Sequence, residues 1–291
     1  MRGSCLSFRS GAHPSSPLAP NCARPRGERQ GPRTLPPRSV SLPPRTILAP
    51  RATPAYNVEV IPIRDTVPSR TAPLVTVALI AVNVLVFLHE TALGPHLERY
   101  VFHYGFIPQR FVHWADYGQD PWDAARFAPL FTSMFWHGGW LHLLGNMLYL
   151  WVFGDNVEHR LGHLRYLLFY VLCGLSAAAA QIAFSPNSAL PTVGASGAIA
   201  GVLGAYLVSF PRSRVVTMLI PPIPWFVQIP AMFFLAFWFL MQLLSGVVSL
   251  GQRADNLGGV AWWAHIGGFI AGIALVKLLE PEELRGAAVG R

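Results

Sequence analysis

Six apolar segments dominate the chain after residue 70. Each is close to the roughly 20 residues that a membrane-spanning helix needs. Several are short or interrupted by polar residues, which is typical of helices that face protein or a cavity rather than lipid. The pattern predicts an all-α polytopic membrane protein with six transmembrane helices, at residues 72–89, 140–157, 164–184, 193–210, 229–248 and 259–279.

The residues before this region follow a different pattern. Residues 1–57 are rich in Pro, Arg and Ser, contain Glu28 as their only acid, and lack a continuous apolar run. Such a stretch is predicted to be disordered and is not a secretory signal peptide. Two explanations stay open: an Arg-rich organellar transit peptide, or a mis-assigned start codon upstream of a natural beginning at residues 57–65. Residues 58–280 are the predicted membrane domain, and residues 281–291 a cytoplasmic tail.

Composition supports a membrane protein. The chain is 52% apolar and 12% charged, whereas soluble domains carry about a quarter charged residues. The net charge of +8 does not indicate nucleic-acid binding, because nine of the 22 basic residues are arginines in the first 51 positions. The three cysteines show no spacing typical of a disulfide framework or a zinc site.

The loop charges predict the orientation of the six helices. Cytoplasmic loops carry an excess of Lys and Arg. This excess falls on one side if both termini are cytoplasmic, while the other side holds fewer basic residues, which lie beside acids. The outer basic residues are Arg99, Arg110, Arg126 and Arg253, beside Glu90, Glu98, Asp116, Asp120, Asp123 and Asp255. The basic residues then predicted to be inside are Arg64, Arg70, Arg160, Arg165, Arg212, Arg214, Lys277, Arg285 and Arg291.

This orientation places four polar residues at one depth. The second, fourth and sixth segments all run from outside to inside. Near their starts lie His142 and Asn146 in the second, Ser196 in the fourth and His265 in the sixth. By helix rise, all four lie roughly 5–10 Å below the outer surface. Polar groups within a membrane are costly and often functional. The pattern therefore predicts a site.

Ser196 and His265 suggest hydrolase chemistry. A serine hydroxyl needs an adjacent base, and His265 is the only histidine after Ser196. Taken alone, Ser196 could equally be a small packing residue, but the matched depth of the pair favours catalysis. Because Asp155 and Glu158 lie at the inner end of the second helix, a Ser–His dyad is predicted rather than a triad.

Glycines offer a means of bringing the two helices together. Gly197 and Gly201 in the fourth segment, and Gly268 and Gly272 in the sixth, form small-xxx-small patterns that allow close helix packing. The run around the serine departs from the Gly-x-Ser-x-Gly elbow of α/β-hydrolases at Ala198.

His142 and Asn146 are four residues apart and therefore share a helix face. With the Ser196 backbone N–H they are candidates to stabilise an oxyanion. The alternative is that they form interhelical hydrogen bonds. His137 starts the same cluster and is predicted to pin the loop structurally.

No metal or cofactor is predicted. The chain contains no His-Glu-x-x-His motif, which argues against a zinc metalloprotease. His159 and His163 are four residues apart, but they belong to the inner loop and are predicted to be solvated or to face phosphate groups.

Four motifs in order resemble the rhomboid intramembrane serine proteases, especially the six-helix bacterial type. The resemblance covers about residues 57–280. The motifs are HGGWLHLLGN at 137–146, EHRLG at 158–162, GASG at 194–197 and AHIGG at 264–268.

The resemblance implies that Ser196 is the nucleophile and His265 the general base, with His142 and Asn146 at the oxyanion. Glu158 and Arg160 would belong to a structural polar cluster. The implied substrates are single-span membrane proteins, cut near the outer face of a bacterial inner membrane. Residues 90–139 would form a partly embedded loop, with interfacial aromatics at Trp114, Trp122, Phe127, Phe131 and Trp136.

One position departs from the family pattern. Some members carry a tyrosine that stacks on the catalytic histidine, where this chain has Ala200. Trp262 or Trp263 could pack the histidine instead.

Two other functions compete with proteolysis. One is a catalytically inactive rhomboid-like protein that binds membrane clients, which the presence of both catalytic residue types disfavours. The other is a six-helix transporter or channel. A transporter would need internal repeats around a midplane site, and neither is evident.

Overall fold

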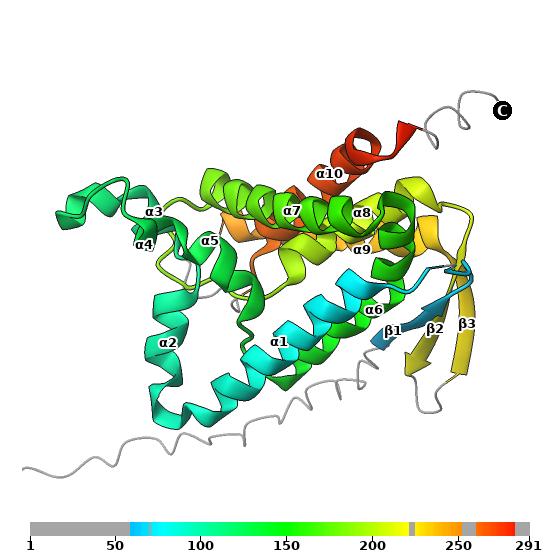
Figure 1. Cartoon of the computed structure of the whole chain (residues 1–291), viewed down its shortest axis with the longest axis horizontal. Helices are drawn as coiled ribbons and strands as arrows, with labels where there is room; N and C mark the ends of the chain where they lie inside the picture. The colour runs from blue at the N-terminus through cyan, green and yellow to red at the C-terminus, as the bar shows by residue number, and fades with distance from the viewer. Residues whose placement is uncertain (1–58, 70, 221–224, 252–259, 283–291) are drawn as a thin grey trace, which may run out of the picture. The chain divides into compact units, whose positions relative to one another are not determined.

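The computed structural model describes residues 59–69, 71–220, 225–251 and 260–282 (Figure 1). The predicted disordered segment at 1–57 and nearly all of the predicted tail at 281–291 lie outside these residues. The described part is mostly helical, which confirms the predicted fold class.

Six long helices account for most of this part of the chain. They lie within a few residues of the six apolar segments predicted from the sequence. They are α1 (Leu74–Ala92), α6 (Trp140–Leu161), α7 (His163–Phe184), α8 (Ser196–Ser209), α9 (Ala231–Leu250) and α10 (Trp262–Leu279).

Within the described residues, four helices are long and apolar enough to cross a membrane: α1, α7, α9 and α10. Helix α8 is equally apolar but has only 14 residues. Helix α6 has 22 residues, and its buried positions include Asn146, Asn156 and Glu158. Together these features make the chain a multi-pass integral membrane protein.

Helix α8 lies at the centre of the bundle, and its backbone touches that of α10. A Cβ atom on Gly268 would collide with the carbonyl oxygen of Gly197, and one on Gly272 with that of Gly201. The four glycines with small-xxx-small spacing therefore lie at this contact. Because no side chain separates the two backbones, residues near the start of α8 and α10 come within hydrogen-bonding reach.

The segment between α1 and α6 is built from short helices. The aromatic rings of Tyr104 and Trp136 stack within it, with centroids 5.0 Å apart. Trp114 is buried, whereas Trp122 is 85% exposed, so the aromatics predicted to be interfacial divide between core and surface. The short helices are η1 (Gly94–His96), α2 (Leu97–Tyr104), α3 (Pro108–Val112), η2 (Trp114–Tyr117), α4 (Ala124–Phe127), α5 (Pro129–Thr132) and η3 (Ser133–Phe135).

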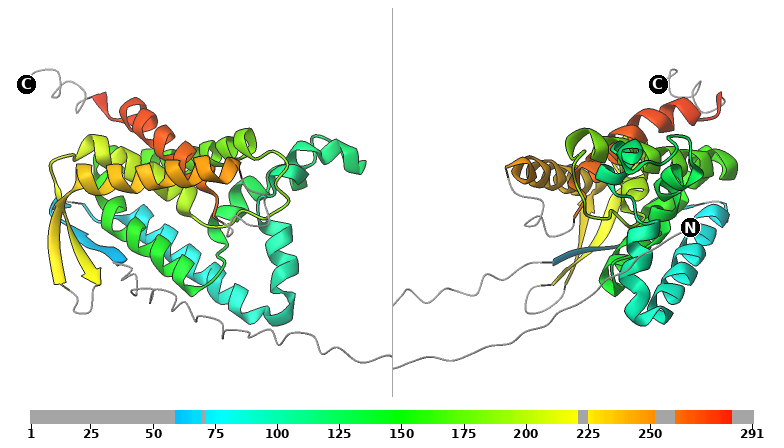
Figure 2. Two further views of the ribbon diagram at one scale, coloured as in Figure 1. Left: turned by 180° about the vertical axis from the view of Figure 1, so that it is seen from behind. Right: turned by 90° about the vertical axis from the view of Figure 1, so that its left-hand side faces the viewer.

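A small antiparallel sheet is the main structural feature that was not predicted from the sequence. Its order is β1 (Glu59–Asp65), β2 (Arg214–Ile220) and β3 (Trp225–Pro230). The strands lie at the opposite end of the long helices from α2–α5 (Figures 1 and 2). The available signal was the β-branched run in β2, where Val215 and Thr217 are buried and alternate with more exposed neighbours.

Candidate functional site

A cavity of about 470 Å³ opens between α6, α8, α9 and α10. Ser196, His265, His142 and Asn146 all line it, so the four polar residues predicted to share one depth meet in one place. The rest of its wall is largely apolar, with Leu141, Tyr149, Ile199, Leu203 and Trp238 among the lining residues.

Ser196 and His265 are in direct contact. Ser196 is the first residue of α8, and His265 lies in the first turn of α10. The Ser196 Oγ and the His265 Nε2 are 2.8 Å apart, which is a hydrogen-bond distance. The backbone contact between α8 and α10 makes this short distance possible.

A glutamine side chain lies on the far side of the His265 ring from Ser196 and extends the pair to a chain of three side chains. The Nδ1 of His265 lies 2.8 Å from the Oε1 of Gln242, which projects from α9 and is 8% exposed. Gln242 is the only amide between residues 229 and 248. A lone amide in an apolar helix is the same signal that pointed to Ser196, so the sequence offered a way to find it.

Two tryptophans surround the His265 ring near the place where a stacking tyrosine is replaced by Ala200. Trp238 lies tilted at 37° with its ring centroid 5.9 Å away, and Trp262 meets the ring edge-on at 6.3 Å. Of the two tryptophans suggested from the sequence, Trp262 is therefore a neighbour of the ring. Trp263 instead stacks on Phe184 at 3.8 Å.

His142 and Asn146 present hydrogen-bond donors on the cavity side of α6. The Gly138 backbone N–H donates to the His142 Nδ1 at 3.3 Å, so a neutral His142 ring carries its proton on Nε2. The Asn146 Nδ2 donates one of its two protons to the Nε2 of His137 at 3.0 Å. The second Asn146 proton remains for another acceptor.

Gly194 brings the backbone between these donors and Ser196. Its φ of +118° is a conformation that L side chains rarely adopt. A Cβ atom here would lie 2.6 Å from the His142 Nε2 and 3.4 Å from the Asn146 Nδ2. The segment predicted as the start of a helix at 193 is thus a turn, and α8 begins only at Ser196.

The residues predicted to be structural, His137 on one hand and Glu158 with Arg160 on the other, lie at the two ends of α6. We name these ends after the predicted orientation: the outer end is near Trp140 and the inner end near Leu161. At the outer end, the His137 backbone N–H donates to the Glu90 carboxylate at 3.0 Å. At the inner end, Arg160 forms an ion pair with Glu280 at 2.6 Å.

His159 and His163, predicted to be solvated, are both exposed, and each also has a protein partner. The Nδ1 of His163 lies 2.6 Å from the Glu158 carboxylate, and that of His159 lies 2.9 Å from the Thr71 hydroxyl. Across the described ranges, no group of three or more His, Cys, Asp or Glu residues is placed to hold a metal ion.

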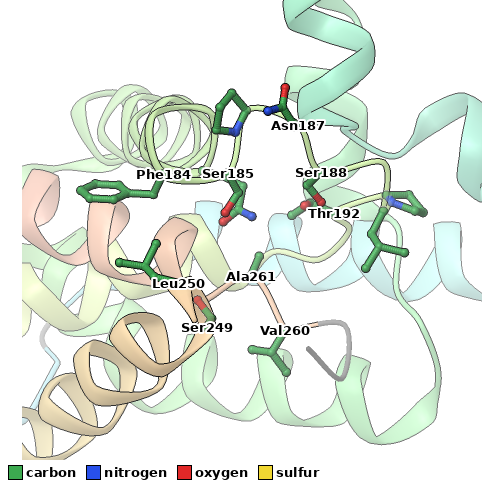
Figure 3. A pocket seen from close by; sticks show the side chains of 13 residues that line it. Phe184, Ser185, Asn187, Ser188, Thr192, Ser249, Leu250, Val260 and Ala261 are labelled. Carbon is green, nitrogen blue, oxygen red and sulfur yellow. The ribbon is translucent and has the colours of Figure 1, made fainter. Parts of the chain in front are cut away.

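A second cavity of about 300 Å³ adjoins the first (Figure 3). It lies between the loop that follows α7 and the residues around the end of α9 and the start of α10. Pro191, Thr192, Val260 and Ala261 line both cavities. Ser185, Asn187, Ser188 and Ser249 add polar groups to the second cavity, so a partly polar cavity borders the Ser196 site.

A comparison with protein families matches residues 124–281 to the Rhomboid domain. This match covers more than half of the chain and includes all the cavity residues that carry polar groups. The chain belongs to the rhomboid family.

Several curated relatives are similar to this rhomboid chain. It is 33% identical over 155 residues to RHOMBOID-like protein 5 of Arabidopsis thaliana, covering 53% of the chain and 45% of that protein. It is 45% identical over 78 residues to the rhomboid protease GluP of Bacillus subtilis, covering 27% of the chain and 15% of that protein. The mitochondrial rhomboid protein 1 of Saccharomyces cerevisiae is 28% identical over 145 residues, covering 48% of the chain and 38% of that protein.

The chain spans less than half the length of the curated relatives that it matches. These relatives support a rhomboid that is either an intramembrane protease or an inactive relative of one. They come from plants, mitochondria and a bacterium, so they support a multi-pass membrane protein without supporting the bacterial inner membrane in particular.

Proposed function

We propose that this rhomboid is an intramembrane serine endopeptidase that cleaves single-span membrane proteins near the outer face of the bilayer. The observation that carries the proposal is the 2.8 Å contact between the Ser196 Oγ and the His265 Nε2 inside a cavity with further donors. A serine that only packed between helices would need neither a histidine partner nor a cavity.

In the first step the Ser196 Oγ attacks the scissile carbonyl carbon and the His265 Nε2 takes the hydroxyl proton. The carbonyl oxygen becomes an oxyanion. Its stabilising donors would be the Ser196 backbone N–H, the His142 Nε2–H and the free Asn146 Nδ2–H. The Ser196 N–H is available because the first N–H groups of a helix have no partner within the helix.

The second half of the reaction releases both products. The His265 Nε2–H protonates the leaving amine as the peptide bond breaks, which leaves an acyl-enzyme on Ser196. Water then attacks the ester while His265 accepts a proton from it, and the Ser196 hydroxyl is regenerated.

The substrate class follows from the position of the cavity. A scissile bond can reach Ser196 only as an extended chain, because helical backbone carbonyls are engaged in their own hydrogen bonds. We therefore expect cleavage at sites where a transmembrane helix unwinds easily, such as those with small residues. The proposal includes six spanning helices with both termini cytoplasmic, and residues 58–280 as the protease domain.

The test combines labelling with cleavage of a reporter. A fluorophosphonate probe should label the wild-type protein in detergent micelles, and a single-span reporter should be cut. Ser196→Ala should abolish both, lowering cleavage by at least about 10³-fold. Ser209→Ala, at the other end of α8, is the matched control and should leave both intact. Reporter binding without labelling or cleavage would instead indicate an inactive rhomboid-like client-binding protein.

A further inference from the structure

Gln242 holds one end of the catalytic histidine, and its chemistry determines which nitrogen carries the proton. The Gln242 Oε1, 2.8 Å from the His265 Nδ1, is a carbonyl oxygen and can only accept a hydrogen bond. The Nδ1 must therefore donate. In the neutral ring this leaves a lone pair on Nε2, which faces the Ser196 hydroxyl at 2.8 Å.

We infer that Gln242 is a positioning residue for catalysis, which orients His265 and keeps it in the tautomer that can accept the Ser196 proton. This inference rests on the proposed protease function. It replaces the predicted dyad with a chain of three side chains, in which a neutral amide stands where serine hydrolases commonly carry a carboxylate.

The packing of α9 against α10 fixes the position of this amide. Trp238, Gln242 and Gly246 are spaced four residues apart and therefore share one face of α9. Trp238 borders the His265 ring, and a Cβ atom on Gly246 would lie 3.1 Å from the Ile266 Cδ1. One face of α9 thus contacts α10 both before and after Gln242, so the backbone that carries the amide is held against α10.

Of the side chains around His265, Gln242 is the one that hydrogen-bonds the Nδ1 of the ring. Helix α8 contributes Ser196 and α9 contributes Gln242, while α6 contributes His142 and Tyr149 as the other titratable side chains of the cavity. The acid Glu90, on α1, is engaged with the His137 backbone N–H. When Ser196 transfers its proton, the imidazolium keeps its Nδ1–H on the Gln242 oxygen, whose dipole offsets part of the new charge.

The experiment compares three variants in the full-length protein with the cleaved reporter as substrate. Gln242→Met keeps the side-chain volume and removes the acceptor. It should lower kcat about 10- to 100-fold, as loss of an orienting partner does at other sites, with KM within about twofold. Gln181→Met is the matched control. Gln181 is also 8% exposed, but it lies on α7, and its substitution should leave kcat unchanged.

Gln242→Glu separates positioning from a merely structural role. A carboxylate at the same place stabilises the imidazolium. The acidic limb of the kcat/KM profile should therefore move to higher pH, while activity above that limb is retained. The acidic limb of Gln181→Met should coincide with that of the wild type.

Three results would overturn the inference while the protease function stands: wild-type kcat in Gln242→Met, an equal loss in Gln181→Met, or an unmoved acidic limb in Gln242→Glu. Absence of Ser196-dependent cleavage by the wild-type protein would instead overturn the proposed function, and the inference with it.

Discussion

Helix α6 carries a buried polar group at each end, and the two ends differ in how fully their hydrogen bonds are used. At the inner end, the Glu158 carboxylate accepts from the Val75 and Thr76 backbone N–H groups at 2.8 Å, from the Thr76 hydroxyl at 2.7 Å, and contacts His163 at 2.6 Å. At the outer end, His142 and Asn146 keep donors that face a cavity.

The inner group has a structural explanation that the outer group lacks. Val75 and Thr76 lie in the first turn of α1, whose N–H groups have no partner within that helix. A carboxylate there satisfies them and interacts favourably with the helix dipole. Glu158 is 1% exposed, so no ligand could reach it. Both ends of α6 contain buried polar groups, so burial alone does not tell them apart. Hydrogen-bond donors that remain unused beside a cavity are what distinguish a candidate reactive site from a structural one.

The largest effect is expected from a pair of asparagines on α6. Asn146→Ala should lower kcat by about 10²–10³-fold, because one oxyanion donor is lost. Asn156→Ala, at the inner end, should leave kcat unchanged and reduce the free energy of unfolding by about 1–2 kcal/mol, because its bond to Asp65 is lost. Reporter cleavage and thermal unfolding measure the two effects. An equal loss of kcat in both variants would contradict the comparison.

Glu158→Ala should have the opposite effects to Asn146→Ala: it should lower stability and leave the reactivity of Ser196 unchanged. Removing the carboxylate leaves the buried N–H of Thr76 and the partly buried N–H of Val75 without this partner, and the free energy of unfolding should fall by about 3 kcal/mol. Glu158→Gln keeps one acceptor oxygen and should lose roughly half as much. At a temperature where the variants remain folded, fluorophosphonate labelling of Ser196 should proceed at the wild-type rate. A labelling rate that falls together with stability would show that the inner end also serves the site.

Gly194→Ala tests whether the backbone turn before Ser196 sets the geometry of the donors. The added Cβ would press on His142 at 2.6 Å, so kcat/KM should fall about 100-fold, as small misplacements of catalytic groups do. Gly94→Ala is the control, because Gly94 also has a positive φ of 51° but has nothing within 4 Å of the added atom. An equal loss in both variants would attribute the effect to backbone strain alone.

The smallest effect concerns Asp65, at the inner end beside β1. Burial raises the pKa of Asp65 above its ordinary value of 3.8, and the hydrogen bond from Tyr206 lowers it only in part. The folded protein therefore binds this proton more tightly than the unfolded chain does. The tighter proton binding by Asp65 contributes fully to the free energy of unfolding at low pH. This contribution is lost as the pH rises from 3.8 through the raised pKa of Asp65.

Asp65→Asn should remove this dependence. The variant should be at least as stable as the wild type at neutral pH, and this advantage should shrink as the pH falls toward 4, roughly the ordinary range of a carboxyl group. Unfolding followed between pH 4 and 8 measures the difference. Glu98→Gln, an exposed position on α2, should show no such change, and a parallel change there would refute the assignment to Asp65.

The sequence was sufficient to locate the long helices and to single out the Ser196–His265 pair. Apolar runs of membrane length form helices wherever they occur, because the bilayer leaves no other way to satisfy their backbone groups. Ser196 and His265 stood out because each interrupts such a run. The inference needed only local composition and the direction in which each helix crosses.

Only the tertiary structure determines which faces of the helices and which strands pack against one another. The sheet pairs β1 with β2 across about 150 residues of chain, and no local pattern specifies that partner. Gln242 became part of the site only because one face of α9 packs on α10. Hydropathy along a chain reports whether a segment is buried, but the partner of each buried polar atom depends on how the helices are rotated and packed.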